Sequence, residues 1–381
     1  MDLRDNQDEA AFRAELRAWL ETSLPEVKRG GRGGAARFDD PFGREWSRML
    51  YDAGYAGLTW PKEYGGAGAP YSFQAIYYEE MARAQAPAHV GVIGLGMAGP
   101  TIIAHGTAAQ KEAHLARILS AEEIWCQGFS EPDAGSDLAA ARTRAERRGD
   151  VYVVNGQKVW SSFAHIADFC ILVTQSDPDA PRYKNLTYLI VDMHSPGVEV
   201  RPLRQITGEA EFNEIFFDDV EVPVDNRLGE EGEGWQVAMT TLLHERGTLG
   251  FALTAALEVG VGKLLDVARE RGNGSAALRE RVATEWIELQ ALRYTNYRSL
   301  GTLQRTGIPG PEGSAIKLRW SEQNQRLTKL GRELLGAEGN LDDGWWHHQQ
   351  LRSRGNTIEA GTSEVLRNIV AERVLGLPRS R

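Results

Sequence analysis

The sequence changes its hydrophobic periodicity twice, and these changes restrict the fold more than any other feature. Apolar residues recur at helical spacing through most of residues 1–122, for example at Phe12 and Leu16. Between about 123 and 230 they fall into short runs separated by turn residues, which is typical of β-strands. Helical spacing returns in residues 234–381. The sequence therefore predicts a helical domain, a small β domain and a helical bundle, in that order.

In the first region, two segments rich in glycine interrupt the helical spacing. Residues 28–37 have the composition of a flexible loop, and GLTWPKEYGGAGAP (57–70) is a turn-rich connection. Around these segments, the spacing predicts a helix near the N-terminus and further helices over 43–54, 72–85 and 107–120.

The middle region contains a dipeptide that is typical of tight hairpin turns. Asn155-Gly156 lies between VYVV and QKVW, so we expect residues 151–160 to form a hairpin. The turn residues that follow are spaced as in a small antiparallel barrel or sandwich. Further strands are predicted over residues 169–175, 186–192, 197–203 and 214–221.

The last region carries four long helical patterns, which predict an antiparallel bundle. They cover residues 234–271, 275–306, 312–336 and 362–375. A chain of 381 residues is long enough for two or three domains of roughly 150 residues. We therefore predict an α+β, mostly α fold with domains over residues 1–122, 123–230 and 231–381.

Charge and composition exclude several classes of protein. The net charge is −10, and nucleic-acid binding needs clustered Lys and Arg, so we expect no nucleic-acid partner. No run approaches the roughly 20 apolar residues of a membrane span, and the N-terminus does not read as a signal peptide. Cys126 and Cys170 are too few for a disulfide framework or a cysteine metal cluster. We expect two buried thiols, no metal and a cytoplasmic protein.

Residues 94–99 (GLGMAG) match the glycine pattern of dinucleotide-binding loops, but their surroundings do not. That loop needs a preceding strand and a βαβ unit, whereas here a long helical region precedes it and Pro100 follows. We therefore favour small residues that let a helix pack closely or line a cavity.

Two segments of the middle region could bind a polar, aromatic ligand. Residues 129–137 (FSEPDAGSD) concentrate hydroxyls and backbone N–H groups, so they form either a binding loop or a structural turn. Trp160 is followed by Ser161 and Ser162, and its ring either covers an aromatic cofactor or belongs to the core.

Two segments of the last region carry possible chemistry. Glu245 lies three residues after Leu242 and four before Leu249, on or beside an apolar helical stripe. Its carboxylate is either a general base, with a pKa raised by burial, or part of a structural ion pair. Gly361-Thr362 opens the last helix, as either an ordinary N-cap or an anion site.

Taken together, four motifs resemble the acyl-CoA dehydrogenase family over nearly the whole chain. They are GFSEPDAGSDL (128–138), VNGQKVWSS (154–162), EFNEIFFDDVEVP (211–223) and GTSEVLRNIVAERVLGLP (361–378). They are most similar to an actinobacterial branch that includes enzymes of steroid side-chain breakdown. The resemblance implies an N-terminal α-helical domain, a central antiparallel β-barrel and a C-terminal four-helix bundle, with FAD between barrel and bundle.

The resemblance implies flavin contacts for residues of the middle region. Phe129 and Ser130 would meet the flavin ring, with Ser130 as a hydrogen-bond donor. Trp160 would cover one flavin face, and Ser162 would reach the edge of the ring.

Further binding residues follow from the same resemblance. Arg271 would reach the FAD pyrophosphate of a neighbouring subunit, and Thr362 and Glu364 would meet the dinucleotide portion of FAD. Ser136 would contact the pantetheine arm of CoA, and Arg246 would lie beside the acyl-CoA site.

The position of the catalytic base differs between two groups of the family. Many members place a Glu just before the Gly-Thr that opens the last helix, and Ala360 stands there in this chain. A second group, similar to isovaleryl- and long-chain enzymes, places the Glu just before a shared arginine, which here is Glu245. The resemblance therefore implies Glu245 as the base, with the backbone N–H of Ala360 donating to the thioester oxygen. Glu359 is expected to point elsewhere.

The implied reaction is FAD-dependent dehydrogenation of an acyl-CoA thioester to the trans-2-enoyl-CoA. An electron-transfer flavoprotein would accept the electrons, and the enzyme would be a homotetramer or homodimer. Residues 88–100, rich in glycine, would line the acyl-tail pocket and permit a wide or branched tail, including a sterol fragment.

Two departures from the family leave alternatives open. Residues 272–275 replace a frequent Gln-Phe-Gly, and Glu333 stands where a family glutamine lies near the FAD diphosphate. The chain could therefore be an FAD-poor or non-catalytic subunit of a heterotetramer. A flavin oxidase or a carrier-protein thioester dehydrogenase of the same fold is the third alternative.

Overall fold

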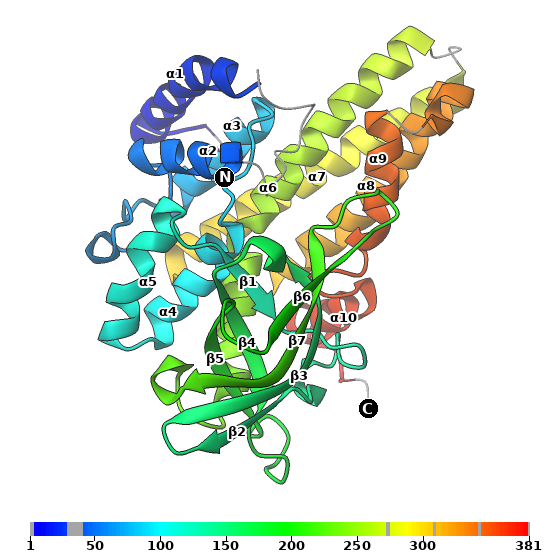
Figure 1. Ribbon diagram of the computed structural model, residues 1–381. Helices are drawn as coiled ribbons and strands as arrows, with labels where there is room; N and C mark the ends of the chain where they lie inside the picture. Colours follow the sequence, from blue (N-terminus) through cyan, green and yellow to red (C-terminus); the bar gives the residue numbers. More distant parts are fainter. Residues whose placement is uncertain (1–3, 29–40, 272–274, 308–309, 342–343, 380–381) are drawn as a thin grey trace. The chain divides into compact units, whose positions relative to one another are not determined.

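The computed structural model describes residues 4–28, 41–271, 275–307, 310–341 and 344–379 (Figure 1). Side chains are not described at 25–28, 41 and 245–249. The chain forms two compact units. The sheet unit comprises Ser23–Ala69 and Pro87–Glu245, and the helical unit comprises Met1–Thr22, Pro70–Ala86 and Arg246–Arg381. The domain boundaries predicted at 122 and 230 stay a prediction.

The sheet unit is built on one eight-stranded sheet, counted over the described residues. Its strands lie in the order β6-β7-β3-β2-β4-β5-β8, with β1 paired to β4. Most pairs are antiparallel, but β1 and β2 run parallel to β4, so the sheet is mixed. The strands are β1 (Trp125–Gly128), β2 (Arg144–Arg148), β3 (Val151–Ser162), β4 (Phe169–Gln175), β5 (Leu186–Asp192), β6 (Val198–Leu203), β7 (Phe212–Pro223) and β8 (Arg227–Leu228).

The predicted hairpin over residues 151–160 is wrong, because these residues belong to the single long strand β3. Gly156 lies in a β-bulge of this strand, and a Cβ added to it would lie 2.8 Å from the Thr143 backbone. The Asn155 amide donates to Asp219 of β7 at 2.9 Å, across the sheet. Asn-Gly therefore marks a bulge and a close backbone approach in this strand. The hairpin in this region is instead formed by β2 and β3, which are joined by a short turn at Gly149 with φ 65°.

Helices of the sheet unit include α2 (Pro41–Asp52), α4 (Gly99–His105) and α5 (Ala108–Ser120). The GLGMAG segment forms the π-helix η2 (Gly94–Ala98) and the start of α4, so it has no dinucleotide-loop geometry. A Cβ on Gly99 would lie 2.0 Å from the Trp60 ring, and one on Gly94 would lie 2.9 Å from Ile118. This confirms the prediction that small residues here allow close helix packing.

Both cysteines lie within the core of the sheet unit. Cys126 of β1 is directly opposite Cys170 of β4, and both thiols are free and fully buried. Burial raises the pKa of the Cys126 thiol, which keeps it protonated and unreactive. The prediction of two buried thiols is therefore confirmed.

The helical unit contains a bundle of four helices, α6 to α9. Its core joins Leu264 of α6, Leu289 of α7, Leu327 of α8 and Trp346 of α9. Figure 1 shows α7, α8 and α9 side by side. The bundle helices are α6 (Gly234–Arg271, which begins in the sheet unit), α7 (Ala276–Thr306), α8 (Glu312–Leu335) and α9 (Trp345–Asn356).

The fourth bundle helix is not the one that the spacing predicts. α9 was missed because Trp345–Asn356 (WWHHQQLRSRGN) is mostly polar and lacks an apolar stripe. Trp346 packs against Gly331 of α8, where a Cβ would come within 2.2 Å of the indole ring, and the buried Ser353 and Asn356 of α9 bind α8 by hydrogen bonds. The predicted helix over 362–375 is instead α10 (Ser363–Ile369), continued by a π-helical turn at Val370–Val374. Apart from this exchange, the order of helices, strands and helices confirms the predicted fold class.

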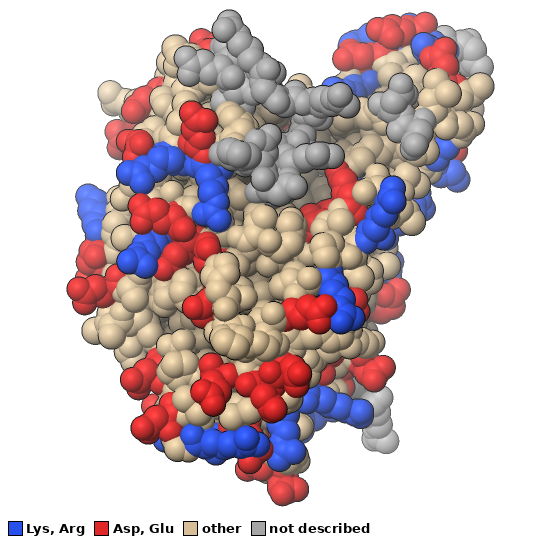
Figure 2. Space-filling view, viewed as in Figure 1, with Lys and Arg blue, Asp and Glu red and all other residues tan. Residues whose placement is uncertain are grey.

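The described surface carries both signs of charge. Figure 2 shows Lys and Arg side chains interspersed with Asp and Glu on the face in view. Among the described helices, none combines the length and apolar character that crossing a bilayer would require.

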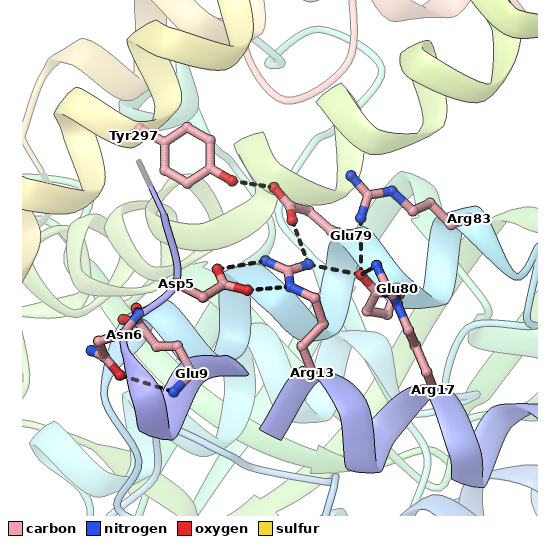
Figure 3. Close-up of polar contacts among 9 residues, drawn as sticks. All are labelled: Asp5, Asn6, Glu9, Arg13, Arg17, Glu79, Glu80, Arg83 and Tyr297. Carbon is pink, nitrogen blue, oxygen red and sulfur yellow. Dashed lines mark hydrogen bonds and ion pairs between the residues drawn. The ribbon is translucent and has the colours of Figure 1, made fainter. Parts of the chain in front are cut away.

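A network of charged side chains joins α1 (Gln7–Lys28), α3 (Tyr71–Arg83) and α7 in the helical unit (Figure 3). Arg13 of α1 donates to Glu79 at 2.9 Å and to Glu80 at 2.7 Å, and it pairs with Asp5 at 2.6 Å. The Tyr297 hydroxyl of α7 donates to Glu79 at 2.6 Å. Arg13 is therefore the centre of the network.

The two glutamates of this network are almost fully buried, so their charge depends on their partners. Burial opposes ionisation of Glu80, but hydrogen bonds from Arg17 and Arg13 outweigh it, and the pKa of Glu80 is lowered. Removing Arg13 would leave the Tyr297 hydroxyl as the remaining described hydrogen-bond partner of Glu79. A buried carboxylate without its counter-charge destabilises the folded state.

We expect Arg13→Met to lower the free energy of unfolding by about 3 kcal/mol, because it breaks a buried ion pair. Arg17→Met is the matched control, because the Arg17 side chain is 52% exposed and Glu80 keeps Arg13 and Arg83. Its cost should stay below about 1 kcal/mol. Urea unfolding of both variants tests this, and equal losses would contradict the central role of Arg13.

Candidate functional site

The loop after β1 is held in place by a buried carboxylate. Glu131 accepts hydrogen bonds from the backbone N–H groups of Arg142 at 2.7 Å and Thr143 at 2.8 Å. It also pairs with Lys158 of β3 at 2.8 Å. Glu131 therefore fixes the loop 129–137 to two other segments of the sheet unit.

Lys158 is fully buried and completes this anchor. Its Nζ donates to the carbonyl oxygen of Phe129 at 3.1 Å as well as to Glu131. Burial opposes the charge on Glu131, but Lys158 and the two backbone donors outweigh it, so the pKa of Glu131 is lowered. The residue pattern does not predict this pair, because Lys158 stands in an ordinary strand pattern.

Trp160 departs from β-strand geometry and lies open to solvent. Its φ is 62°, in the left-handed region that non-glycine residues seldom adopt. Strand β3 bulges away from β7 between Lys158 and Ser161, and the Trp160 side chain is 59% exposed. A large aromatic ring held outside the core at a strained residue favours a binding role over a packing role.

The remaining predicted residues of the sheet unit surround the same loop and strand. The buried ring of Phe129 meets Tyr188 edge-on, with centroids 5.8 Å apart, and the carbonyl of Ser130 accepts from Val159 N–H at 2.9 Å. Ser162 is half-buried at the end of β3, and Ser136 is exposed in the loop. The structure thus brings four predicted residues to one loop and the adjoining end of β3: Phe129, Ser130, Trp160 and Ser162.

In the helical unit, the turn before α10 presents a free backbone donor. Ala360 has φ 50°, and its N–H donates to no acceptor among the described residues. Thr362 caps α10 by accepting from the backbone N–H of Val365 at 3.2 Å, and Glu364 is exposed in the first turn. Thr362 is thus an N-cap, whatever further role it has.

Two groups that sequence reasoning missed or set aside fix this turn. Lys317 of α8 is almost fully buried and donates to the carbonyl oxygens of Asn356 at 2.7 Å and Gly361 at 2.8 Å. Before the structure, the one indication that Lys317 is buried was its position among the residues on the buried face of α8. Glu359 pairs with Arg352 at 2.8 Å and accepts from Asn356 at 2.7 Å, so its carboxylate already has partners.

Arg271 and Glu333 each have an ionic partner in the helical unit. Arg271, the last residue of α6, pairs with Glu338 at 2.7 Å. Glu333 pairs with Arg281 at 2.6 Å, which offsets the charge that makes it a poor neighbour for phosphate. Residues 272–274 lie outside the described residues.

Glu245 and Arg246 lie in the first half of α6, but their side chains are outside the described part of the structure. Their assignment as base and substrate-binding residue stays a prediction.

The chain is similar to curated acyl-CoA dehydrogenases over almost its whole length. It is 42% identical over 385 residues to "Acyl-CoA dehydrogenase IpdE1" of Mycobacterium tuberculosis, covering 98% of this chain and 99% of that protein. It is 41% identical over 389 residues to the IpdE1 of Mycolicibacterium smegmatis, covering 97% of each chain.

Solved structures give the same result. A structure titled "Tcur3481-Tcur3483 steroid ACAD" matches with a TM-score of 0.89 and 32% identity, covering 100% of both chains. The ChsE4-ChsE5 complex from Mycobacterium tuberculosis matches with a TM-score of 0.87 and 30% identity, again covering 100% of both chains.

Models of the acyl-CoA dehydrogenase N-terminal, middle and C-terminal domains match residues 6–122, 126–220 and 232–375. Together with the relatives, these matches show the class: the protein is a flavoenzyme of the oxidoreductase type. The chain belongs to the acyl-CoA dehydrogenase family, whose cofactor is FAD.

The described residues fit such a cofactor in each unit taken alone. The sheet unit presents the exposed indole of Trp160 and, two residues later, the half-buried Ser162, residue types suited to cover a flavin ring and bind its edge. The Ser161 hydroxyl is buried with no hydrogen-bond partner among the described residues. The helical unit offers the free N–H of Ala360. The role of each predicted residue stays a proposal.

We expect Glu131→Gln to cost about 3 kcal/mol of stability at pH 7, because Lys158 loses its buried counter-charge. The lowered pKa of Glu131 gives a stabilisation that is present above the ordinary carboxyl pKa and lost as pH falls through the folded value. The difference between wild type and variant should therefore shrink as the pH falls from 7 to 3.

Urea unfolding at several pH values measures this difference. Glu146→Gln is the control, because Glu146 is an exposed residue of the same unit and pairs with Arg148 at the surface. A difference between wild type and Glu131→Gln that stays constant with pH would contradict the assigned charge state.

Proposed function

We propose that the protein catalyses FAD-dependent α,β-dehydrogenation of an acyl-CoA thioester to the trans-2-enoyl-CoA. The observation that carries the proposal is the pair of positions 245 and 360: Ala360 lacks a carboxylate, and Glu245 stands directly before Arg246. Family membership and the free N–H of Ala360 support the same reaction.

In this proposal Glu245 removes the proton from the α-carbon of the thioester. The α C–H is weakly acidic, so the negative charge that develops on the thioester oxygen must be stabilised. The N–H of Ala360 is the proposed donor, and Lys317 supports it by holding the carbonyls on both sides of the turn. This donor is a backbone group, so it does not depend on the side chain at position 360.

FAD, when bound, supplies a two-electron acceptor for the hydride that leaves the β-carbon. Phe129, Ser130, Trp160 and Ser162 are the proposed contacts of its ring. Arg271, Thr362 and Glu364 are the proposed contacts of its dinucleotide portion. Ser136 and Arg246 are proposed to bind the acyl-CoA.

For the acyl group, we infer a bulky substrate of the steroid class. One relative at 32% identity is titled a steroid ACAD, which supports this class. Turnover of a straight short-chain thioester in preference to a branched or ring-bearing one would contradict this inference.

The proposed partners are an electron-transfer flavoprotein and further subunits. The two solved structures are each named for a pair of proteins, which supports a heteromer of two similar chains as the alternative to a homotetramer or homodimer. A cytoplasmic location remains part of the proposal.

We expect Glu245→Gln to slow flavin bleaching by an acyl-CoA at least about a hundredfold, because the reaction loses its general base. FAD should remain bound, since the proposed flavin contacts are unchanged. Stopped-flow absorbance of the holoenzyme measures the rate.

Glu258→Gln provides the control, because Glu258 is a half-exposed carboxylate on the same helix outside the proposed site. An unchanged bleaching rate in Glu245→Gln would exclude Glu245 as the base. Rapid reoxidation of the bleached flavin by oxygen would favour the oxidase alternative.

We expect the chain purified alone, without added FAD, to show a flavin spectrum with close to one FAD per chain. The reason is that Arg281 already pairs with Glu333, which reduces its conflict with a nearby diphosphate. Visible absorption measures the occupancy. A colourless protein that takes up FAD only with a second, similar chain would contradict the self-sufficient enzyme and support the heteromer.

A further inference from the structure

Asn213 lies next to the strained residues of the sheet unit and has no role in the proposed chemistry. It is the second residue of β7, directly opposite Ser161 of β3, and its side chain is fully buried. Figure 1 shows β3 and β7 side by side. The EFNEIFFDDVEVP motif that contains Asn213 marks the family without assigning this residue a task.

The amide of Asn213 donates to backbone carbonyls on two segments. Its Nδ2 lies 3.0 Å from the carbonyl oxygen of Ser161 and 3.1 Å from that of Glu211. The same nitrogen lies 3.2 Å from Nδ1 of His165. A side-chain oxygen in this place would face two carbonyl oxygens, so the amide orientation is fixed by its neighbours.

The Ser161 carbonyl belongs to the end of β3, where the backbone departs from strand geometry, and the Glu211 carbonyl lies just before β7. Trp160 and Phe163 both have φ 62°, and each such non-glycine residue needs surroundings that hold it. Ser161 directly follows Trp160, and the carbonyl of Glu211 also accepts from the N–H of Phe163 at 2.8 Å. Asn213 therefore binds between the two left-handed residues.

The other side of Trp160 is held by the loop. Strand β3 leaves β7 after Lys158, and the N–H of Val159 donates to the carbonyl of Ser130. Trp160 is thus fixed on its N-terminal side by the loop and on its C-terminal side by Asn213. Loss of either contact would free the backbone to relax towards ordinary strand geometry.

We propose that Asn213 is a positioning residue that holds the Trp160 bulge and thereby sets the orientation of the indole ring against the flavin. This inference rests on the proposed role of Trp160 as a flavin contact. It assigns Asn213 no contact with cofactor or substrate: the residue acts through the Ser161 carbonyl.

The test is a double-mutant cycle between Asn213 and Trp160, read out on FAD-loaded and FAD-free protein. Asn213→Ala deletes the amide, and Asn213→Asp keeps its shape but replaces the donor by a carboxylate. We expect each to weaken FAD binding about tenfold and to shift the flavin absorption bands as Trp160→Phe does. In the Trp160→Phe background, the Asn213 variants should add little further change.

Asn226→Ala is the matched control, because its amide donates to the Ile190 carbonyl at 3.2 Å in the same unit, away from the bulge. It should leave FAD affinity and the flavin spectrum as in wild type.

Three results would overturn the inference. Unchanged FAD affinity and flavin spectrum in folded Asn213 variants would do so, as would effects that simply add to those of Trp160→Phe. If Trp160→Phe alone leaves the flavin unchanged while the Asn213 variants alter it, Asn213 does not act through Trp160. If Trp160→Phe and the Asn213 variants all leave the flavin unchanged, the proposed role of Trp160 fails as well.

Discussion

The buried ion pair between Lys158 and Glu131 is the interaction on which the proposed flavin-binding part of the sheet unit depends. An unpaired charge in this place would be unstable, so each side chain requires the other. Because Lys158 precedes Trp160 by two residues and Glu131 follows Phe129 by two, the pair fixes the loop and the strand in one register. Asn213 holds the other side of the bulge. The backbone on both sides of the exposed Trp160 is therefore fixed by buried polar groups, the Lys158–Glu131 pair and the Asn213 amide.

The long-range order of helices and strands could be predicted from the sequence, because periodicity depends on which face of an element is buried. The prediction of a hairpin at Asn155-Gly156 was wrong because of contacts with other strands. The dipeptide permits a tight turn, but Asp219 on β7 offers Asn155 a partner across the sheet, and Gly156 admits the Thr143 backbone. Pairing with a strand some sixty residues away decided the outcome, and a single sequence does not show that pairing.

Residues of the candidate site could be predicted where a sequence motif contains them. Residues whose role depends on polar partners far away in the sequence could not be predicted. Phe129, Ser130, Trp160 and Ser162 came from motif resemblance, and the structure brings them to one loop and the adjoining end of β3. Lys317 and Glu131 were missed, because a lysine in a helix or a glutamate in a turn is an ordinary surface residue until its partners are known. Helix α9 was missed for a related reason. It has no apolar stripe, and its main apolar contact is that of Trp346 with Gly331.

The two hydrogen bonds of Lys317 have a consequence for how this family can diversify. Both bonds end on main-chain oxygens around position 360, so these two contacts do not depend on the side chain at that position. A lineage could therefore lose an acidic side chain in this turn and keep the proposed backbone donor to the thioester oxygen. In the proposed reaction, a different helix then supplies the general base, while the proposed backbone donor to the thioester oxygen stays in this turn.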